Sequence, residues 1–134
     1  MASLLLKTYR QQWLPALAWA VLLLLLSGWP SDRLPKIDWR NDLFGVDKAA
    51  HFVFYALFAI LLSFPLRKSG VKYPGWMAFS IALIYGMLME MMQYAFFPGR
   101  QLDVGDMLAN GLGAGGGVAL YFTGYRLMNG RSNT

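Results

Sequence analysis

The 134-residue chain contains no cysteine, one histidine and few charged residues, which make up 14% of its length. Without cysteine, neither a disulfide framework nor a thiolate metal site is possible. Soluble domains carry about 25% charged residues, whereas 57% of this chain is hydrophobic. One domain of this size cannot bury so much apolar surface within itself, so we expect lipid to cover part of it.

Four apolar segments are long enough, or nearly so, to cross a bilayer, which takes about 20 mostly apolar residues in a helix. They cover roughly residues 13–29, 48–66, 74–97 and 104–125. Pro74 suits the start of the third segment, and Pro98 with Gly99 suits its end. The pattern predicts an all-α fold over residues 1–134, a polytopic membrane protein whose transmembrane helices, about four in number, form one compact bundle.

The first apolar segment follows Lys7 and Arg10, as the core of a cleaved signal peptide would. The residues that end it, at positions 27–30, include the bulky Trp29, which makes a poor cleavage site. We therefore expect this segment to be retained as a membrane anchor.

The net charge of +5 fits basic loops that orient a membrane protein. No basic run is interleaved with aromatic residues, so no nucleic-acid partner is expected. The tails and the second loop carry seven basic residues and no acid: Lys7, Arg10, Arg67, Lys68, Lys72, Arg126 and Arg131. The other loops carry Arg33, Lys36, Arg40, Lys48 and Arg100, accompanied by six aspartates. Because lysine and arginine favour cytoplasmic loops, we expect both termini in the cytoplasm.

Polar side chains interrupt the last three segments within a turn or two of the outer surface. They are Asp47, His51, Tyr55, Glu90, Gln93, Asp106 and Asn110. At about 1.5 Å per residue, His51, Glu90 and Asn110 all lie about 6–10 Å below that surface. Positions 47, 51 and 55 share one helix face, as do positions 103, 106 and 110. Ionisable groups at this depth need a partner or water, so the pattern predicts one outward-opening polar pocket.

Four of these residues are candidates for acid–base chemistry: His51, Glu90, Asp47 and Asp106. His51 is interpreted as a base or proton carrier, or as a hydrogen bond between helices. Glu90 is interpreted as a functional carboxylate or as a structural partner between two helices. Asp47 either orients His51 across one turn or caps its helix. Asp106 is assigned a functional role, because Asp103 is better placed as a cap.

Six residues are candidates for holding a substrate: Lys48, Tyr55, Gln93, Arg100, Asp103 and Asn110. Lys48 and Arg100 suit an anionic headgroup, and Arg100 equally suits a snorkelling cation at the membrane interface. Gln93 and Asn110 also suit hydrogen bonds between helices. Tyr55 also suits packing in the core.

Glycines crowd the fourth segment, where Gly111 with Gly115, and Gly113 with Gly117, have the GxxxG spacing. This spacing lets two helix backbones approach closely. We expect these glycines to serve packing within the bundle rather than dimerisation, and an oligomer remains open.

The order and spacing of the polar residues form three motifs. These are Asp47-Lys48-x-x-His51-Phe52-x-x-Tyr55, Glu90-x-x-Gln93, and Pro98-Gly99-Arg100-x-x-Asp103-x-x-Asp106-x-x-x-Asn110-x-x-Gly113. Together they resemble the VanZ-like family of small bacterial membrane proteins, over about residues 45–117. The resemblance implies a multi-span helical protein of the bacterial inner membrane. It also implies an association with the cell envelope, since the family is named for a protein linked to resistance to the lipoglycopeptide teicoplanin.

Two classes of function fit this pattern. In the first, His51 and Glu90 are the acid–base pair of an enzyme, oriented by Asp47, that acts on an envelope lipid or a lipid-linked precursor. No serine or cysteine lies near the motifs, so a water nucleophile or direct transfer fits better than an acyl-enzyme. In the second, the pocket binds a lipid or a lipoglycopeptide without turnover and contributes to antibiotic tolerance.

Two further interpretations concern transport and metal binding. A monomeric transporter is disfavoured, because the chain has four short spans and no repeat symmetry. No dedicated cofactor or zinc site is expected from one histidine and no cysteine. His51, Glu90 and the aspartates nevertheless suit Mg²⁺ or Mn²⁺, so a divalent cation is conceivable.

Overall fold

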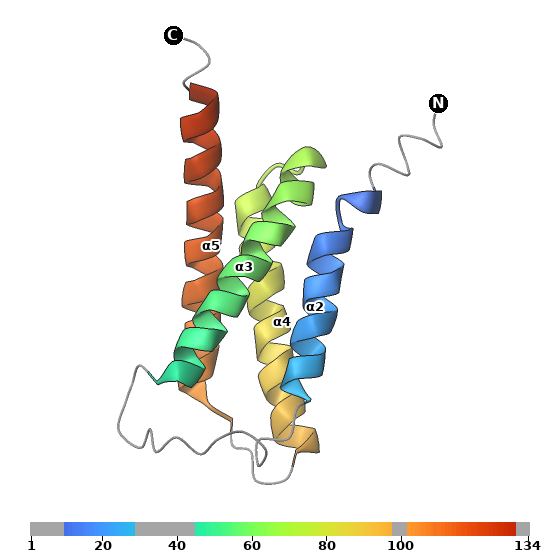
Figure 1. Cartoon of the computed structure of the whole chain (residues 1–134), viewed down its shortest axis with the longest axis vertical. Helices are drawn as coiled ribbons and strands as arrows, with labels where there is room; N and C mark the ends of the chain where they lie inside the picture. The colour runs from blue at the N-terminus through green and yellow to red at the C-terminus, as the bar shows by residue number, and fades with distance from the viewer. Residues whose placement is uncertain (1–9, 29–44, 98–101, 131–134) are drawn as a thin grey trace.

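A computed structural model describes residues 10–28, 45–97 and 102–130 of the chain, and it is all-helical in these ranges (Figure 1). The helices are α2 (Leu14–Ser27), α3 (Val46–Lys68), α4 (Pro74–Phe96) and α5 (Val104–Gly130). The predicted all-α fold with four helical segments is therefore confirmed. The last helix continues five residues beyond its predicted end at residue 125, and its C-terminal part projects past the other helices (Figure 1).

Local sequence explains where two of the helices begin and end. Gly45 caps α3, Asp47 lies in its first turn, and Arg67 with Lys68 lies in its last turn. This distribution of charge complements the positive N-terminal and negative C-terminal ends of the helix dipole. Pro74 occupies the first turn of α4, where its missing N–H group breaks no helical hydrogen bond.

Two helices in the described part of the chain are long and apolar enough to cross a membrane. They are Asp47–Lys68, with a mean hydropathy of 2.0, and Pro74–Phe96, with a mean hydropathy of 1.4. Helix α2 is apolar but has 14 residues, about 21 Å in length, which is shorter than the roughly 30 Å hydrocarbon core. Helix α5 is long enough, but its glycines, Asp106, Asn110 and Arg126 lower its hydropathy.

The helices expose large apolar side chains on their outer faces, among them Leu25 on α2, Val53 on α3, Leu88 on α4 and Leu112 on α5. Soluble monomers rarely expose extended apolar patches. The exposed positions belong to all four helices, so the outer surface suits a lipid environment better than water.

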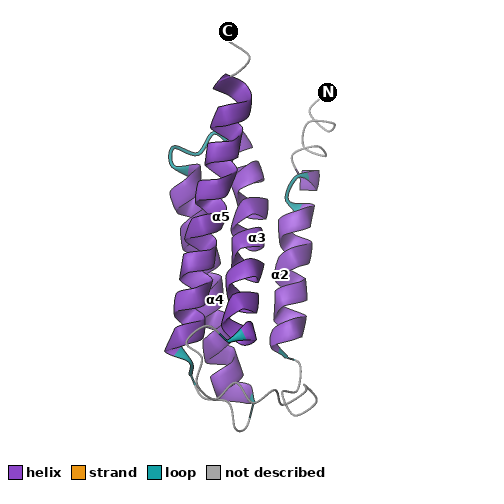
Figure 2. Cartoon of the chain, turned by 60° about the vertical axis from the view of Figure 1, so that its left-hand side comes forward, coloured by secondary structure: helices purple, strands orange, loops and turns teal. Residues whose placement is uncertain are grey.

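Small residues allow the helices to pack closely, and the tightest contact joins α3 to α5 (Figure 2). A Cβ atom at Gly113 would overlap the main-chain oxygen of Phe52, and one at Gly117 would overlap that of Ala56. The GxxxG pair at 113 and 117 therefore serves packing within the bundle, as predicted. Between the helices, Ala59, Ala78 and Ala114 are completely buried.

Helix α2 is attached to the bundle by three side chains that donate hydrogen bonds to main-chain carbonyl oxygens. Trp19 Nε1 donates to the Phe54 oxygen at 3.0 Å. Tyr85 Oη donates to the Ala20 oxygen at 2.6 Å, and Gln93 Nε2 donates to the Ser27 oxygen at 3.2 Å. Two of these acceptors are carbonyls of α2 itself, so this helix is joined to α4 at both its middle and its end.

The helix order places charges of opposite sign at the two ends of the bundle. Helices α3 and α5 begin where α2 and α4 end (Figure 1). This end, called the acidic end below, carries the described acidic residues Asp47, Glu90, Asp103 and Asp106. The opposite end, called the basic end, carries Arg10, Arg67, Lys68, Lys72 and Arg126 among the described residues.

Candidate functional site

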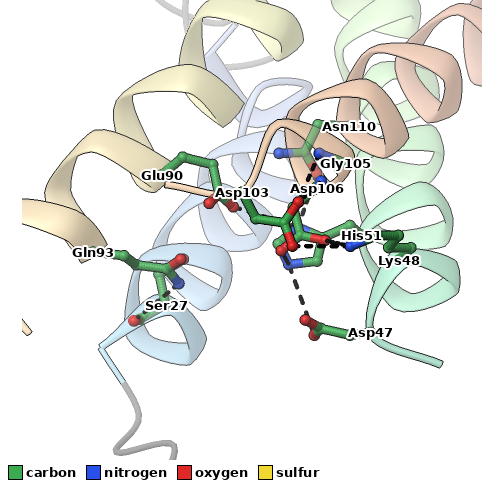
Figure 3. A network of polar contacts seen from close by, with 10 residues as sticks. All are labelled: Ser27, Asp47, Lys48, His51, Glu90, Gln93, Asp103, Gly105, Asp106 and Asn110. Carbon is green, nitrogen blue, oxygen red and sulfur yellow. Dashed lines mark hydrogen bonds and ion pairs between the residues drawn. The ribbon is translucent and has the colours of Figure 1, made fainter. Parts of the chain in front are cut away.

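Polar side chains from three helices meet at the acidic end (Figure 3). Helix α3 contributes Asp47, Lys48 and His51 from its first two turns. Helix α4 contributes Glu90, and α5 contributes Asp106 and Asn110. Glu90, Asp106 and Asn110 are buried, His51 is partly buried, and the side chain of Asp47 is 80% exposed. The cluster is therefore closed on the side of α4 and open to solvent beside Asp47.

Lys48 is the cation of this cluster, and it bridges two carboxylates. Its Nζ atom donates to Asp103 Oδ2 at 3.0 Å and to Asp106 Oδ1 at 3.1 Å. The other oxygen of Asp103, Oδ1, accepts the N–H group of Gly105 at 2.7 Å and that of Asp106 at 3.4 Å. Asp103 thus caps the start of α5, as predicted, and holds Lys48 at the same time. The charge of Lys48 is already compensated, so a substrate anion would compete with Asp103 and Asp106 for it.

The ring of His51 is held by Asn110 from the neighbouring helix. His51 Nδ1 lies 2.9 Å from Asn110 Oδ1. An amide oxygen only accepts hydrogen bonds, so Nδ1 carries the proton in this contact. In the neutral ring, the lone pair is therefore on Nε2. Asp47 was predicted either to orient this ring or to cap the helix. Its nearest contact with the ring is 3.9 Å, beyond hydrogen-bonding distance, and the N-cap residue of α3 is Gly45.

Three carboxylates surround the imidazole of His51 at equal distances. Nε2 lies 3.9 Å from Asp47 Oδ1 and 3.9 Å from Asp106 Oδ2. Nδ1 lies 3.9 Å from Glu90 Oε1. Asp106 divides its two oxygens, with Oδ1 on Lys48 and Oδ2 facing His51. The predicted acid–base pair of His51 and Glu90 is thus adjacent in space without a direct hydrogen bond between these two atoms.

The absence of a side chain at Gly86 leaves room for the side chain of Asn110. A Cβ atom at this position would lie 3.0 Å from Asn110 Nδ2 and 3.0 Å from Tyr55 Cε1. Asn110 Nδ2 is buried and has no hydrogen-bond partner among the described residues. Sequence reasoning missed Gly86, although an isolated glycine between large apolar residues of a spanning helix is a usable signal of close approach.

Three of the predicted substrate-holding residues lie apart from His51 or outside the described ranges. Tyr55 is 3% exposed and belongs to the hydrophobic core, where its ring packs edge-on against Phe58. Gln93 turns toward the end of α2 and donates to the Ser27 carbonyl (Figure 3). Arg100 lies outside the described residues. The functional roles assigned to these residues stay predictions.

A groove of about 470 Å³ lies between α4 and α5, toward the basic end of the bundle. Gly75, Trp76, Phe79 and Phe122 are among its lining residues, with Arg126 at its edge. None of the residues around His51 lines it. Its mostly apolar walls lack the carboxylate and imidazole groups of the cluster, so the candidate site is the cluster at the acidic end.

Asp103 gives the protein a measurable dependence on pH. The hydrogen bond from Lys48 holds the pKa of Asp103 below its ordinary value of 3.8. A depressed pKa adds stability that is present above the unfolded pKa and is lost as pH falls through the folded pKa. Since the Asp103 side chain is 48% exposed, solvent screening limits this contribution to less than about 1 kcal/mol.

We therefore expect the melting temperature of the wild type to fall more steeply below about pH 4 than that of an Asp103→Asn variant. Asparagine retains a capping oxygen, so the variant removes the titrating charge and keeps the cap. Thermal unfolding in detergent, recorded from neutral pH to about pH 3, measures the difference. Parallel curves for the two proteins would contradict the assignment.

Comparison with known proteins gives one family match. A family model described as VanZ/LLP1 matches residues 6–127, which include all four helices except the last three residues of α5. No match was found among curated proteins or among solved structures.

Proposed function

Because the chain belongs to the VanZ-like family, we propose that it is a multi-pass protein of the bacterial inner membrane that performs acid–base chemistry on the headgroup of an envelope lipid or a lipid-linked precursor. The observation that carries this proposal is the position of His51. Its ring lies 3.9 Å from carboxylate oxygens of Asp47, Asp106 and Glu90, and its other contact is the hydrogen bond with Asn110.

The arrangement suits proton transfer because the ring is fixed by Asn110 and one of its nitrogens is left for a substrate or water. Asn110 holds Nδ1 and so presents Nε2 toward the open side of the cluster, where Asp47 is exposed. Water is the proposed nucleophile. Its oxygen bonds to the headgroup atom under attack while Nε2 takes its proton, the bond from that atom to the leaving oxygen breaks, and the leaving oxygen receives a proton in return.

The proposed topology has all four helices crossing the membrane, with the basic end in the cytoplasm. The described part of the basic end carries five lysine and arginine residues and no acid, which is the distribution of cytoplasmic loops. The exposed leucines support lipid contact for α2, which is short, and for α5, which has a lower mean hydropathy than α3 and α4. In this topology the His51 cluster faces the periplasm, where envelope precursors are processed.

The test compares two site variants, one on α3 and one on α4, with a surface variant on α4. Reconstituted protein is incubated with the total lipid extract of a bacterial inner membrane, and products and bound lipids are identified by mass spectrometry. We expect His51→Gln and Glu90→Gln to lower product formation by about 100-fold or more, while lipid still co-purifies. Tyr94→Phe is the control, because Tyr94 follows Gln93 on α4 and is 62% exposed.

Two other outcomes would reject catalysis. If no product forms with any variant but lipid or teicoplanin binding weakens in His51→Gln, the pocket is a binding site without turnover. If both site variants only lower the melting temperature, the cluster is a structural contact between helices.

A further inference from the structure

The His51 ring presents an electrostatic conflict in the absence of an additional positive charge. With Nδ1 donating to Asn110, the neutral ring directs the lone pair of Nε2 toward oxygens of Asp47 and Asp106. Nε2 then faces one oxygen of each aspartate across 3.9 Å, and the three electron-rich atoms lie within 4.8 Å of one another. Lys48 does not relieve this repulsion, since it binds Asp106 through the other oxygen, Oδ1. The space between these three atoms needs a proton or a cation.

The distances favour a cation. A proton on Nε2 would form a hydrogen bond with an N···O distance of about 2.7–3.2 Å, whereas both observed distances are 3.9 Å. Two ligands that each lie about 2.1 Å from a common metal ion are separated by about 3 to 4.2 Å, depending on the angle between them. The three donor atoms lie within 4.8 Å of one another. To occupy adjacent positions on an octahedral ion, each aspartate oxygen has to move about 1 Å closer to His51 Nε2, and the exposed Asp47 side chain has room to do so.

We propose that Asp47, His51 and Asp106 bind a divalent cation of the Mn²⁺ or Mg²⁺ class. Two carboxylate oxygens and one imidazole nitrogen form a donor set that these ions accept, and the three remaining positions of an octahedral ion are left for water and substrate oxygens. Asn110 is the outer-shell partner, because its bond to Nδ1 selects the ring form with a free Nε2. Lys48 similarly orients Asp106 through Oδ1.

The cation also removes a difficulty in the recognition of an anionic headgroup, and this step rests on the proposed function. Among the described residues around His51, Asp47, Glu90, Asp103 and Asp106 provide four carboxylates, and Lys48 provides one positive charge. A phosphate would be repelled by that surface. A divalent ion on Asp47, His51 and Asp106 would bind the phosphate oxygens directly and would acidify an attacking water. With the ion bound, His51 would act as a ligand, and acidification of the water by the ion would take the place of the proton transfer to Nε2 proposed above.

The single histidine of the chain makes this site directly observable. Protein labelled with ¹⁵N-histidine gives signals from His51 alone, and bound Mn²⁺ broadens the signals of its ligands. In full-length protein held in zwitterionic detergent, we expect Mn²⁺ to broaden both ring nitrogens, and electron paramagnetic resonance to count one bound ion per chain. Asp47→Asn and Asp106→Asn are each expected to raise the Mn²⁺ concentration for half-broadening at least ten-fold.

Asp103→Asn is the matched control, because it removes one negative charge from the same end of the bundle without removing a proposed ligand. Its Mn²⁺ affinity should stay within about two- to three-fold of the wild type, because Asp103 reaches the proposed ligand Asp106 only through Lys48, whose own bond to Asp106 is kept. Asp47→Asn is expected to leave folding unchanged, because the Asp47 side chain is 80% exposed. The proposal is overturned if the His51 signals do not respond to Mn²⁺, or if Asp47→Asn and Asp103→Asn weaken binding equally. It is also overturned if both ring nitrogens are protonated at pH 7 and remain so with Mn²⁺ present.

The lipid assay separates this result from the proposed function. Mn²⁺ binding at His51 without any lipid product would retain the cation site and reject catalysis. Product formation that chelators do not affect, with no Mn²⁺ response at His51, would retain catalysis and reject the cation site.

Discussion

Replacing Gly113 with alanine is expected to lower the free energy of unfolding by about 3 kcal/mol, toward the upper limit of ordinary overpacking effects. The added methyl group would meet the carbonyl oxygen, carbonyl carbon and Cα atom of Phe52. These are main-chain atoms of a helix and have no rotamer that moves them away, so α3 and α5 have to separate. Unfolding of the purified protein in detergent, followed by circular dichroism, measures this loss.

Gly115→Ala is the control for Gly113→Ala, because its Cβ atom would lie 3.8 Å from Phe79, an ordinary contact. Alanine stabilises a helix by up to about 1 kcal/mol relative to glycine, so this variant should be as stable as the wild type or more stable. The two substitutions differ by two positions on the same helix and should have opposite signs. Equal stability of the two variants would show that α3 and α5 are not in main-chain contact at Gly113.

The second large effect is expected from Lys48→Met. This substitution keeps the apolar stem but removes the positive charge between Asp103 and Asp106. The Asp106 side chain is 10% exposed, and a carboxylate that loses its cation in a buried position destabilises a protein by about 3–5 kcal/mol. Because Lys48 is itself 23% exposed, we expect about 2–3 kcal/mol, at or below the lower end of that range.

Two further variants test the cause of the Lys48→Met effect. Lys72→Met, at the basic end, makes the same chemical change on an exposed residue beside Tyr73 and should change stability by less than about 0.5 kcal/mol. The double variant Lys48→Met with Asp106→Asn should regain part of the lost stability, because it removes the uncompensated carboxylate. If the double variant is less stable than Lys48→Met alone, the loss does not come from Asp106.

Sequence periodicity was sufficient to predict that the polar residues lie at one end of the bundle. His51, Glu90 and Asn110 were predicted at a common depth from the helical rise and from the direction in which each segment runs. The structure places them side by side, with His51 in contact with Asn110 and 3.9 Å from Glu90. Apolar length and proline positions likewise located α3 and α4 to within two residues at each end.

The pairing of side chains could not be predicted, because it depends on distances between helices. Asn110 reaches the ring of His51 only because Gly113 and Gly117 let α5 lie directly on the backbone of α3. A separation larger by one methyl group would leave this hydrogen bond too long. Sequence spacing made Asp47 a candidate partner of His51, with capping of the helix as the alternative, because the two residues are one turn apart. In the structure the exposed Asp47 side chain stays 3.9 Å from the ring.

The position of Gln93 around the axis of α4 explains a second difference between the predicted and the observed site. Gln93 lies three residues after Glu90, which turns it about 60° away from Glu90 around the helix axis. That rotation directs Gln93 to α2 rather than to the ring of His51, and its amide donates to the Ser27 carbonyl. Hydropathy alone does not specify a rotation of this size within a largely apolar helix such as α4.

The attachment of α2 determines which of its positions are free to vary over evolutionary time. Tyr85 and Gln93 of α4 bind the peptide oxygens of Ala20 and Ser27, and every amino acid carries such an oxygen. Substitution of one α2 leucine by another apolar residue leaves these two acceptors in place. Selection on this attachment therefore acts on Tyr85, Gln93 and the indole of Trp19, while the exposed apolar positions of α2 are free of this constraint.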